Sequence, residues 1–86
     1  MELKFKPTAE TDLQFWYETS NKKILKRIEE LLKSTIETPF SGIGKPEPLR
    51  YNLSGYWSRR IDQENRMIYK VEDDTITIHS LRGHYL

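Results

Sequence analysis

The chain has 86 residues, of which 36% are hydrophobic and 31% are charged, and it includes five tyrosines, three phenylalanines and two tryptophans. This length predicts one domain, and the aromatic content argues against disorder. The absence of cysteine excludes a disulfide framework and a thiolate metal site, and a net charge of +1 only weakly supports a nucleic-acid partner. We see no apolar run near the roughly 20 residues of a membrane span and no secretory signal, so we expect a cytoplasmic protein.

The N-terminal segment predicts a short strand followed by a helix. Residues 2–6 alternate, with Leu3 and Phe5 on one side, and the alternation ends at Pro7. The helix that follows is expected to be capped by Thr8 or Thr11. Its apolar face is expected to consist of Ala9, Leu13, Trp16 and Tyr17.

A second, longer helix is predicted from Lys22 to about Glu37, after a break at Ser20-Asn21 that offers a cap. The connection is short, so the two helices should form an antiparallel hairpin. We interpret the apolar stripe as core rather than as a partner-binding or membrane-surface helix, and the basic cluster as a solvated face. The stripe comprises Ile24, Leu25, Ile28, Leu31, Leu32 and Ile36, and the basic cluster comprises Lys22, Lys23, Lys26 and Arg27.

The stretch from residue 42 to residue 50 contains two glycines and two prolines, which exclude a helix interior or a central strand. It carries a single carboxylate, Glu47, which stands between two prolines with Lys45 and Arg50 nearby. Such a rigid loop is either a stiff connector or a platform for chemistry.

The second half of the chain predicts three strands, at residues 56–62, 66–71 and 75–81. Gln63-Glu64 and Asp73-Asp74 mark the turns between them, which indicates an antiparallel meander. The predicted fold is therefore α+β: an N-terminal strand, a helical hairpin and an antiparallel sheet with the helices on one face.

Two arginines flank the first predicted hairpin. If Gln63 is the hairpin centre, Arg60 and Arg66 lie opposite each other on one face. Either Asp62 or Glu64 neutralises them, or the register differs by one residue, or the two guanidinium groups form an anion site.

Two histidines occur in the chain, His79 and His84, and no acidic or thiol residue lies between them, so we expect no metal site and no cofactor. His79 is expected to face solvent. Together with Glu47 and the arginines, His84 completes the set that metal-independent RNA cleavage requires: a base, an acid and a cation. Spacing alone does not show that these groups converge.

Five segments carry a resemblance to a known family. They are Pro39-Phe40, Gly42-x-Gly44-Lys45-Pro46-Glu47-Pro48-Leu49, Leu53-Ser54-Gly55-x-Trp57-Ser58-Arg59-Arg60-Ile61, Arg66-x-Ile68-Tyr69 and His84-Tyr85. In this order and spacing, over nearly the whole chain, the sequence resembles the YoeB/Txe family of toxins from bacterial type II toxin–antitoxin modules, within the RelE superfamily.

The resemblance implies a RelE-like, microbial-ribonuclease-like fold and a ribosome-dependent endoribonuclease that cuts mRNA in the ribosomal A site. By that resemblance, Glu47 matches the general base, Arg66 the ligand of the transition-state phosphate and His84 the general acid. Tyr85 matches a terminal tyrosine that holds or stacks the substrate.

Further RNA-binding residues are implied in the same way. Arg50 and Arg60 match basic positions around the scissile phosphate, and Lys45 and Arg59 are expected to line the surrounding surface. Trp57 either stacks on a base there or belongs to the core.

The resemblance also implies partners: a homodimer and a YefM-like antitoxin, with operator DNA bound only through the antitoxin. Two departures from the family pattern concern the tail, because Leu86 follows the tyrosine and Gly83 replaces a larger polar residue. The alternatives are a ParE-like, gyrase-directed toxin of the same fold and a non-catalytic nucleic-acid-binding domain.

Overall fold

The computed structural model describes residues 1–83 and shows one five-stranded sheet in the order β1-β5-β4-β3-β2. The strands are β1 (Glu2–Phe5), β2 (Glu47–Pro48), β3 (Tyr56–Arg60), β4 (Arg66–Glu72) and β5 (Thr75–Ser80). β3, β4 and β5 form the predicted antiparallel meander, and β2 extends it at one edge. β1 pairs in parallel with β5 at the other edge, a partnership that the sequence pattern did not specify.

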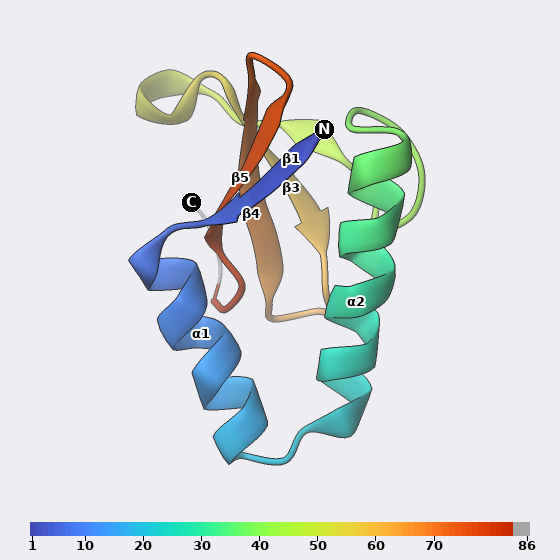
Figure 1. Cartoon of the computed structure of the whole chain (residues 1–86), viewed down its shortest axis with the longest axis vertical. Coiled ribbons are helices and arrows are strands. Elements are labelled where there is room, and N and C mark those ends of the chain that lie inside the picture. The colour runs from blue at the N-terminus through green and yellow to red at the C-terminus, as the bar shows by residue number, and fades with distance from the viewer. Residues whose placement is uncertain (84–86) are drawn as a thin grey trace.

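Two helices complete the fold, α1 (Pro7–Glu18) and α2 (Lys22–Glu37), and the predicted α+β class is confirmed. Figure 1 shows them joined at one end by a short connection and diverging from it, and in this view the strands are seen between the two helices. The predicted Asn21 cap is present, since its side chain accepts a hydrogen bond from the backbone N–H of Ile24 at 3.2 Å.

The predicted threonine caps of α1 are wrong. Lys6 is the N-cap residue and makes no side-chain cap, and Pro7 starts the helix because its fixed φ suits the first helical position. The hydroxyl of Thr8 instead donates to the backbone carbonyl of His79. This contact joins the start of α1 to the end of β5.

The core lies between the helices and one face of the sheet, and it includes Ala9, Trp16, Ile24, Ile28, Leu31, Met67, Tyr69, Ile76 and Ile78. The predicted apolar faces are correct in their main members. Tyr17 and Ile36 are exceptions, with 60% and 42% of their surface exposed. Trp16 fills the core position beside Tyr17, and its indole N–H donates to the carbonyl of Leu81 at 2.9 Å.

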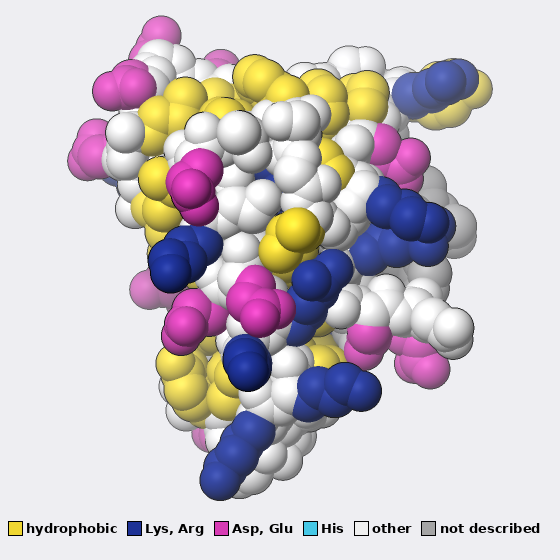
Figure 2. Space-filling model, turned by 90° about the vertical axis from the view of Figure 1, so that its right-hand side faces the viewer, with side chains coloured by type: hydrophobic (Ala, Val, Ile, Leu, Met, Phe, Trp, Pro, Cys, Tyr) yellow, Lys and Arg dark blue, Asp and Glu magenta, His cyan; other side chains and the backbone are white. Residues whose placement is uncertain are grey.

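The outer face of α2 is the solvated face that the sequence predicts. Figure 2 shows basic and acidic side chains interspersed on this side of the molecule. Lys22, Lys23 and Lys26 are exposed, and Arg27 pairs with Glu30 at 3.9 Å. Within residues 1–83, no helix is long and apolar enough to cross a membrane.

The opposite face of the sheet, here called the open face, carries the alternate residues of each strand. Met67 and Tyr69 of β4 belong to the core, so Arg66, Ile68 and Lys70 point to the open face. Strand register then places Glu47 and Ile68 on either side of Ser58 on that face.

Candidate functional site

Glu47 and Arg66, the predicted base and phosphate ligand, lie together on the open face. Glu47 stands on the edge strand β2 and Arg66 begins β4, with one strand between them. Glu47 Oε1 lies 3.5 Å from Arg66 Nη1, and the two side chains are 61% and 19% exposed. That nitrogen has no hydrogen-bond partner among the described residues, so the contact is an ion pair without hydrogen-bond geometry. The carboxylate therefore remains accessible to a ligand.

Arg60 and Arg66 are directly opposite each other in the β3–β4 register, as the hairpin centre at Gln63 predicts. Of the alternatives for their counter-charge, neither Asp62 nor Glu64 supplies it. Asp62 Oδ1 instead accepts the backbone N–H groups of Glu64 and Asn65 at 2.8 and 2.7 Å and shapes the turn. Glu47 is the carboxylate that approaches this arginine pair.

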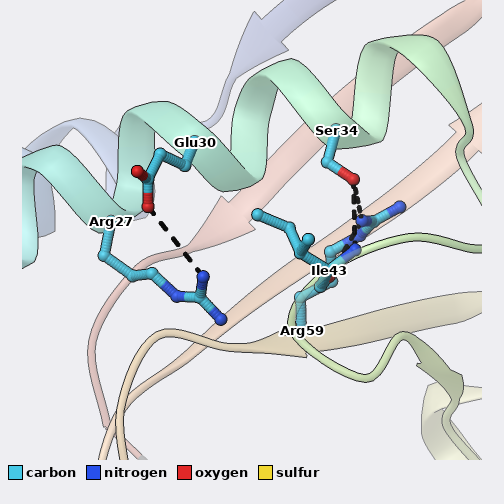
Figure 3. Close-up of polar contacts among 5 residues, drawn as sticks. All are labelled: Arg27, Glu30, Ser34, Ile43 and Arg59. Atoms are coloured by element: carbon cyan, nitrogen blue, oxygen red, sulfur yellow. Dashed lines mark hydrogen bonds and ion pairs between the residues drawn. The ribbon is translucent and has the colours of Figure 1, made fainter.

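Arg59, predicted to line the RNA-binding surface, is buried with 0% of its surface exposed, so that prediction is wrong. The period of two along β3 puts it on the core face, where it pairs with Met67. Its guanidinium group donates to Tyr69 Oη, Ser34 Oγ and the carbonyls of Ile43, Thr38 and Ser41, at 2.6–3.1 Å. Figure 3 shows the side chain of Arg59 reaching Ser34 on α2, beside Ile43.

These bonds fix the chain that leads from α2 to Glu47. The hydroxyl of Tyr69 donates to the carbonyl of Pro39 at 2.6 Å, which adds a further tie. Burial raises the pKa of Tyr69, while the hydrogen bond and the positive charge of Arg59 oppose that rise. The loop between α2 and Glu47 is therefore fixed by hydrogen bonds from the buried side chains of Arg59 and Tyr69, as well as by its prolines.

Gly44 is needed where this approach passes closest to α2. Its φ is +82°, and a Cβ there would lie 2.6 Å from Leu31 Cδ2 and 3.1 Å from Arg59 Cβ. A larger residue would push the loop away from the helix. Gly44 also places its carbonyl to accept the backbone N–H of Arg60 at 2.7 Å.

The catalytic residues predicted at the C-terminus, His84 and Tyr85, lie outside the described residues, as does Leu86. Gly83, the last described residue, is fixed at the site. Its carbonyl accepts the backbone N–H of Arg66 at 3.1 Å, and its own N–H donates to Asn65 Oδ1 at 2.8 Å. Gly83, which directly precedes His84, is therefore hydrogen-bonded to the backbone of Arg66.

The remaining predicted RNA-binding residues are exposed. Lys45 and Arg50 flank β2, and Arg60 ends β3. Trp57 lies on the other face of the sheet, against the core, with its ring 4.8 Å from that of Phe40. The core reading of Trp57 is confirmed.

Two further residues lie on the open face. The sequence prediction for His79 was wrong, and Ser58 was not predicted as a site residue. His79 is half-buried with its ring 5.4 Å from that of Tyr56, so the expectation that it only faces solvent is wrong. Burial lowers its pKa, Lys6 lowers it further, and Asp12 acts in the opposite direction. Ser58, 1% exposed, stands opposite Glu47, and its hydroxyl has no hydrogen-bond partner in the described part of the chain. Alternation along residues 56–60 was the signal that places Ser58 on the face of Arg60.

Among residues 1–83, no three His, Cys, Asp or Glu side chains gather in a way that could hold a metal ion. The groups brought together are one carboxylate and two guanidinium groups, which suit binding of a phosphodiester.

The fold described above, a five-stranded sheet with a helical hairpin on one face, also occurs in a solved structure of low sequence identity. YafQ from Escherichia coli has this fold, with a TM-score of 0.81 at 15% identity. Residues 5–85 match the YoeB-like toxin of bacterial type II toxin–antitoxin systems. The chain belongs to this toxin family.

Individual relatives agree with that assignment. Toxin YoeB of Escherichia coli K12 is 55% identical over 74 residues, which is 86% of this chain and 87% of the relative. Toxin YoeB of Streptomyces coelicolor is 46% identical over 85 residues, or 99% and 100%. A YoeB/ParE toxin from Agrobacterium tumefaciens has a TM-score of 0.94 at 37% identity, covering 99% of this chain and 100% of that one. A YoeB–YefM complex from Staphylococcus aureus contains a chain with a TM-score of 0.87 at 45% identity, covering 99% and 98%.

Proposed function

We propose that this toxin is a ribosome-dependent endoribonuclease that cuts mRNA in the ribosomal A site and so inhibits translation. The observation that carries the proposal is the Glu47–Arg66 pair, in which an accessible carboxylate and a guanidinium group from separate strands lie 3.5 Å apart. The whole chain acts as one toxin domain, and its target lies in the cytoplasm.

In the proposed reaction Glu47 takes the proton of a ribose 2′-OH, and the 2′-oxygen attacks the adjacent phosphorus. Arg66 and Arg60 stabilise the negative charge on the phosphorane. His84 donates a proton to the departing 5′-oxygen, and Tyr85 holds the substrate. The products are a 2′,3′-cyclic phosphate and a 5′-hydroxyl, and no metal or cofactor takes part.

Support for the role of His84 comes from the residue before it, since Gly83 is hydrogen-bonded to the backbone of Arg66. Lys45 and Arg50, both exposed beside β2, contact the RNA backbone in this proposal. Arg59 has no such role because its guanidinium group is buried and hydrogen-bonded.

We also propose a YefM-like antitoxin as partner, a homodimer as the free form, and operator DNA as a target only through the antitoxin. The support is by relationship: similar Staphylococcus aureus structures are described as a YoeB dimer and as a YoeB–YefM complex. Both cover 99% of this chain at 44–45% identity.

A ParE-like activity against gyrase is the second candidate, because the similar Agrobacterium toxin is described as YoeB/ParE. A translation extract with a defined mRNA separates the two. Ribosome-dependent cuts within codons, detected by primer extension, support the endoribonuclease. Intact mRNA together with impaired DNA supercoiling would overturn it in favour of the second candidate.

A further inference from the structure

A second cluster of cationic and aromatic side chains lies on the open face, away from the residues assigned above. We call Lys6, Tyr56, Lys70 and His79 the tyrosine cluster. Lys6 Nζ and Lys70 Nζ lie 5.7 and 5.3 Å from the centre of the Tyr56 ring, and the His79 ring meets it edge-on at 5.4 Å. Lys6 Nζ also donates to the Tyr56 hydroxyl at 3.5 Å.

The positive charges of this cluster are only partly balanced within the described chain. Lys70 pairs with Glu72 at 3.7 Å, but Glu72 is 67% exposed. Lys6 has no carboxylate within salt-bridge distance among residues 1–83. Two ammonium groups brought to one ring repel each other, and a bound anion would relieve that repulsion.

One polar atom of the cluster also lacks a partner. His79 Nδ1 is buried and makes no hydrogen bond within the described residues. A buried polar atom without a partner is costly, so this side of the His79 ring is not stabilised by the described residues.

The tyrosine cluster is continuous with the Glu47–Arg66 pair. Tyr56 and Ser58 lie on the same face of β3, two residues apart, which corresponds to about 7 Å along the strand. Ser58 is the register partner of Glu47. The Tyr56 end of the cluster is therefore the end nearest to the carboxylate.

We propose that the tyrosine cluster binds a nucleotide that neighbours the scissile bond, with Lys6 and Lys70 at its phosphate and Tyr56 and His79 at its sugar and base. This inference rests on the proposed function. A single-stranded RNA fits the cluster better than an acidic peptide does. Lysines bind carboxylates as well as phosphates, but the two aromatic rings beside them match the stacking contacts by which proteins hold the bases of single-stranded nucleic acids.

The test is the affinity of the full chain for a short single-stranded RNA whose 2′-hydroxyls are methylated, so that it cannot be cut. Titration by fluorescence anisotropy at several salt concentrations compares the parent with Lys6→Gln/Lys70→Gln. We expect the double variant to bind about tenfold more weakly, with a salt slope smaller by roughly 0.7 for each lost phosphate contact. The matched control is Lys22→Gln/Lys23→Gln on the outer face of α2, which removes the same charge and should bind like the parent.

Equal affinities of the parent and Lys6→Gln/Lys70→Gln, or equal losses in both double variants, would overturn the proposal. So would a loss of affinity confined to an acidic peptide probe. Thermal unfolding of each variant verifies the fold, and Tyr56→Leu gives an independent variant that should also weaken RNA binding. The binding experiment measures no cleavage, so its result is independent of whether the proposed reaction is correct. The reaction is tested separately, with Glu47→Gln and an RNA that can be cut.

Discussion

Adjacent arginines in β3 have opposite roles, because successive strand residues point to opposite faces. Arg60 is exposed on the open face, whereas Arg59 is buried and joins the loop at residues 38–43 to the core. The core reading of Trp57 already implied this, since Arg59 shares its face. The surface position expected for Arg59 came from the family resemblance, and that expectation did not apply the alternation along β3.

Replacing Arg59 with methionine should destabilise the protein by about 3 kcal/mol, because several buried acceptors would lose their donor. Urea denaturation measures the free energy of unfolding. The matched control, Arg60→Met, removes an exposed arginine from the next position and should change that free energy by less than about 0.5 kcal/mol. Similar losses in both variants would contradict the structural role of Arg59.

His79 makes the stability of the protein depend on pH. Its pKa in the folded state is below the ordinary value of 6.5, so the unfolded chain binds a proton more readily. The stability contributed by the neutral form of His79 is therefore fully present above pH 6.5, and it is lost as the pH falls through the lower pKa of the folded state. Groups that face the ring include Lys6, Asp12 and Tyr56.

We expect His79→Gln to reduce the loss of stability between pH 7 and pH 5, about the ordinary histidine range. Urea denaturation of parent and variant across this interval gives the comparison. A parallel decline in both proteins would show that His79 does not contribute to the pH dependence.

At the scale of elements, the loop between α2 and β2 positions Glu47 through its fit against α2. Gly44 and Gly55 both have positive φ, at +82° and +96°, but their surroundings differ. A Cβ at Gly55 meets nothing closer than Lys70 Cε at 3.6 Å, whereas one at Gly44 meets Leu31 Cδ2 at 2.6 Å.

Gly44→Ala should therefore cost about 1–2 kcal/mol more stability than Gly55→Ala, because both strain the backbone but only the first crowds the helix. Thermal and urea unfolding of the two variants test the difference. Equal destabilisation would mean that the loop moves away from α2 without cost.

The elements and the pairings within the meander were predictable, but the partners of the two edge strands were not. Alternation and turn residues located the meander, and the apolar stripe located α2 at Lys22–Glu37. The parallel pairing of β1 with β5 joins segments about 70 residues apart, and local alternation carries no information on that choice. β2 has two residues, too few for a periodic signal, and it forms because the loop passes β3 in register with Ser58.

For the whole molecule, the net charge of +1 conceals an uneven surface. Basic and acidic groups alternate over α2, while the open face carries Lys6, Arg60, Arg66 and Lys70 near Glu47 and Glu72. Convergence of Glu47 with Arg66 could not be derived from spacing, since it depends on the order β4-β3-β2 in the sheet. Only the family resemblance led us to expect Glu47 and Arg66 in one site.

The most direct test of the central claim is single-turnover cleavage of mRNA on programmed ribosomes by the parent chain and by Glu47→Gln. The glutamine keeps the size of the side chain and removes its basicity. The account predicts cleavage by the parent that leaves a 2′,3′-cyclic phosphate, and a rate at least about 100-fold lower for the variant with unchanged ribosome binding. Cleavage by Glu47→Gln at the parental rate, or intact mRNA with the parent, would contradict it.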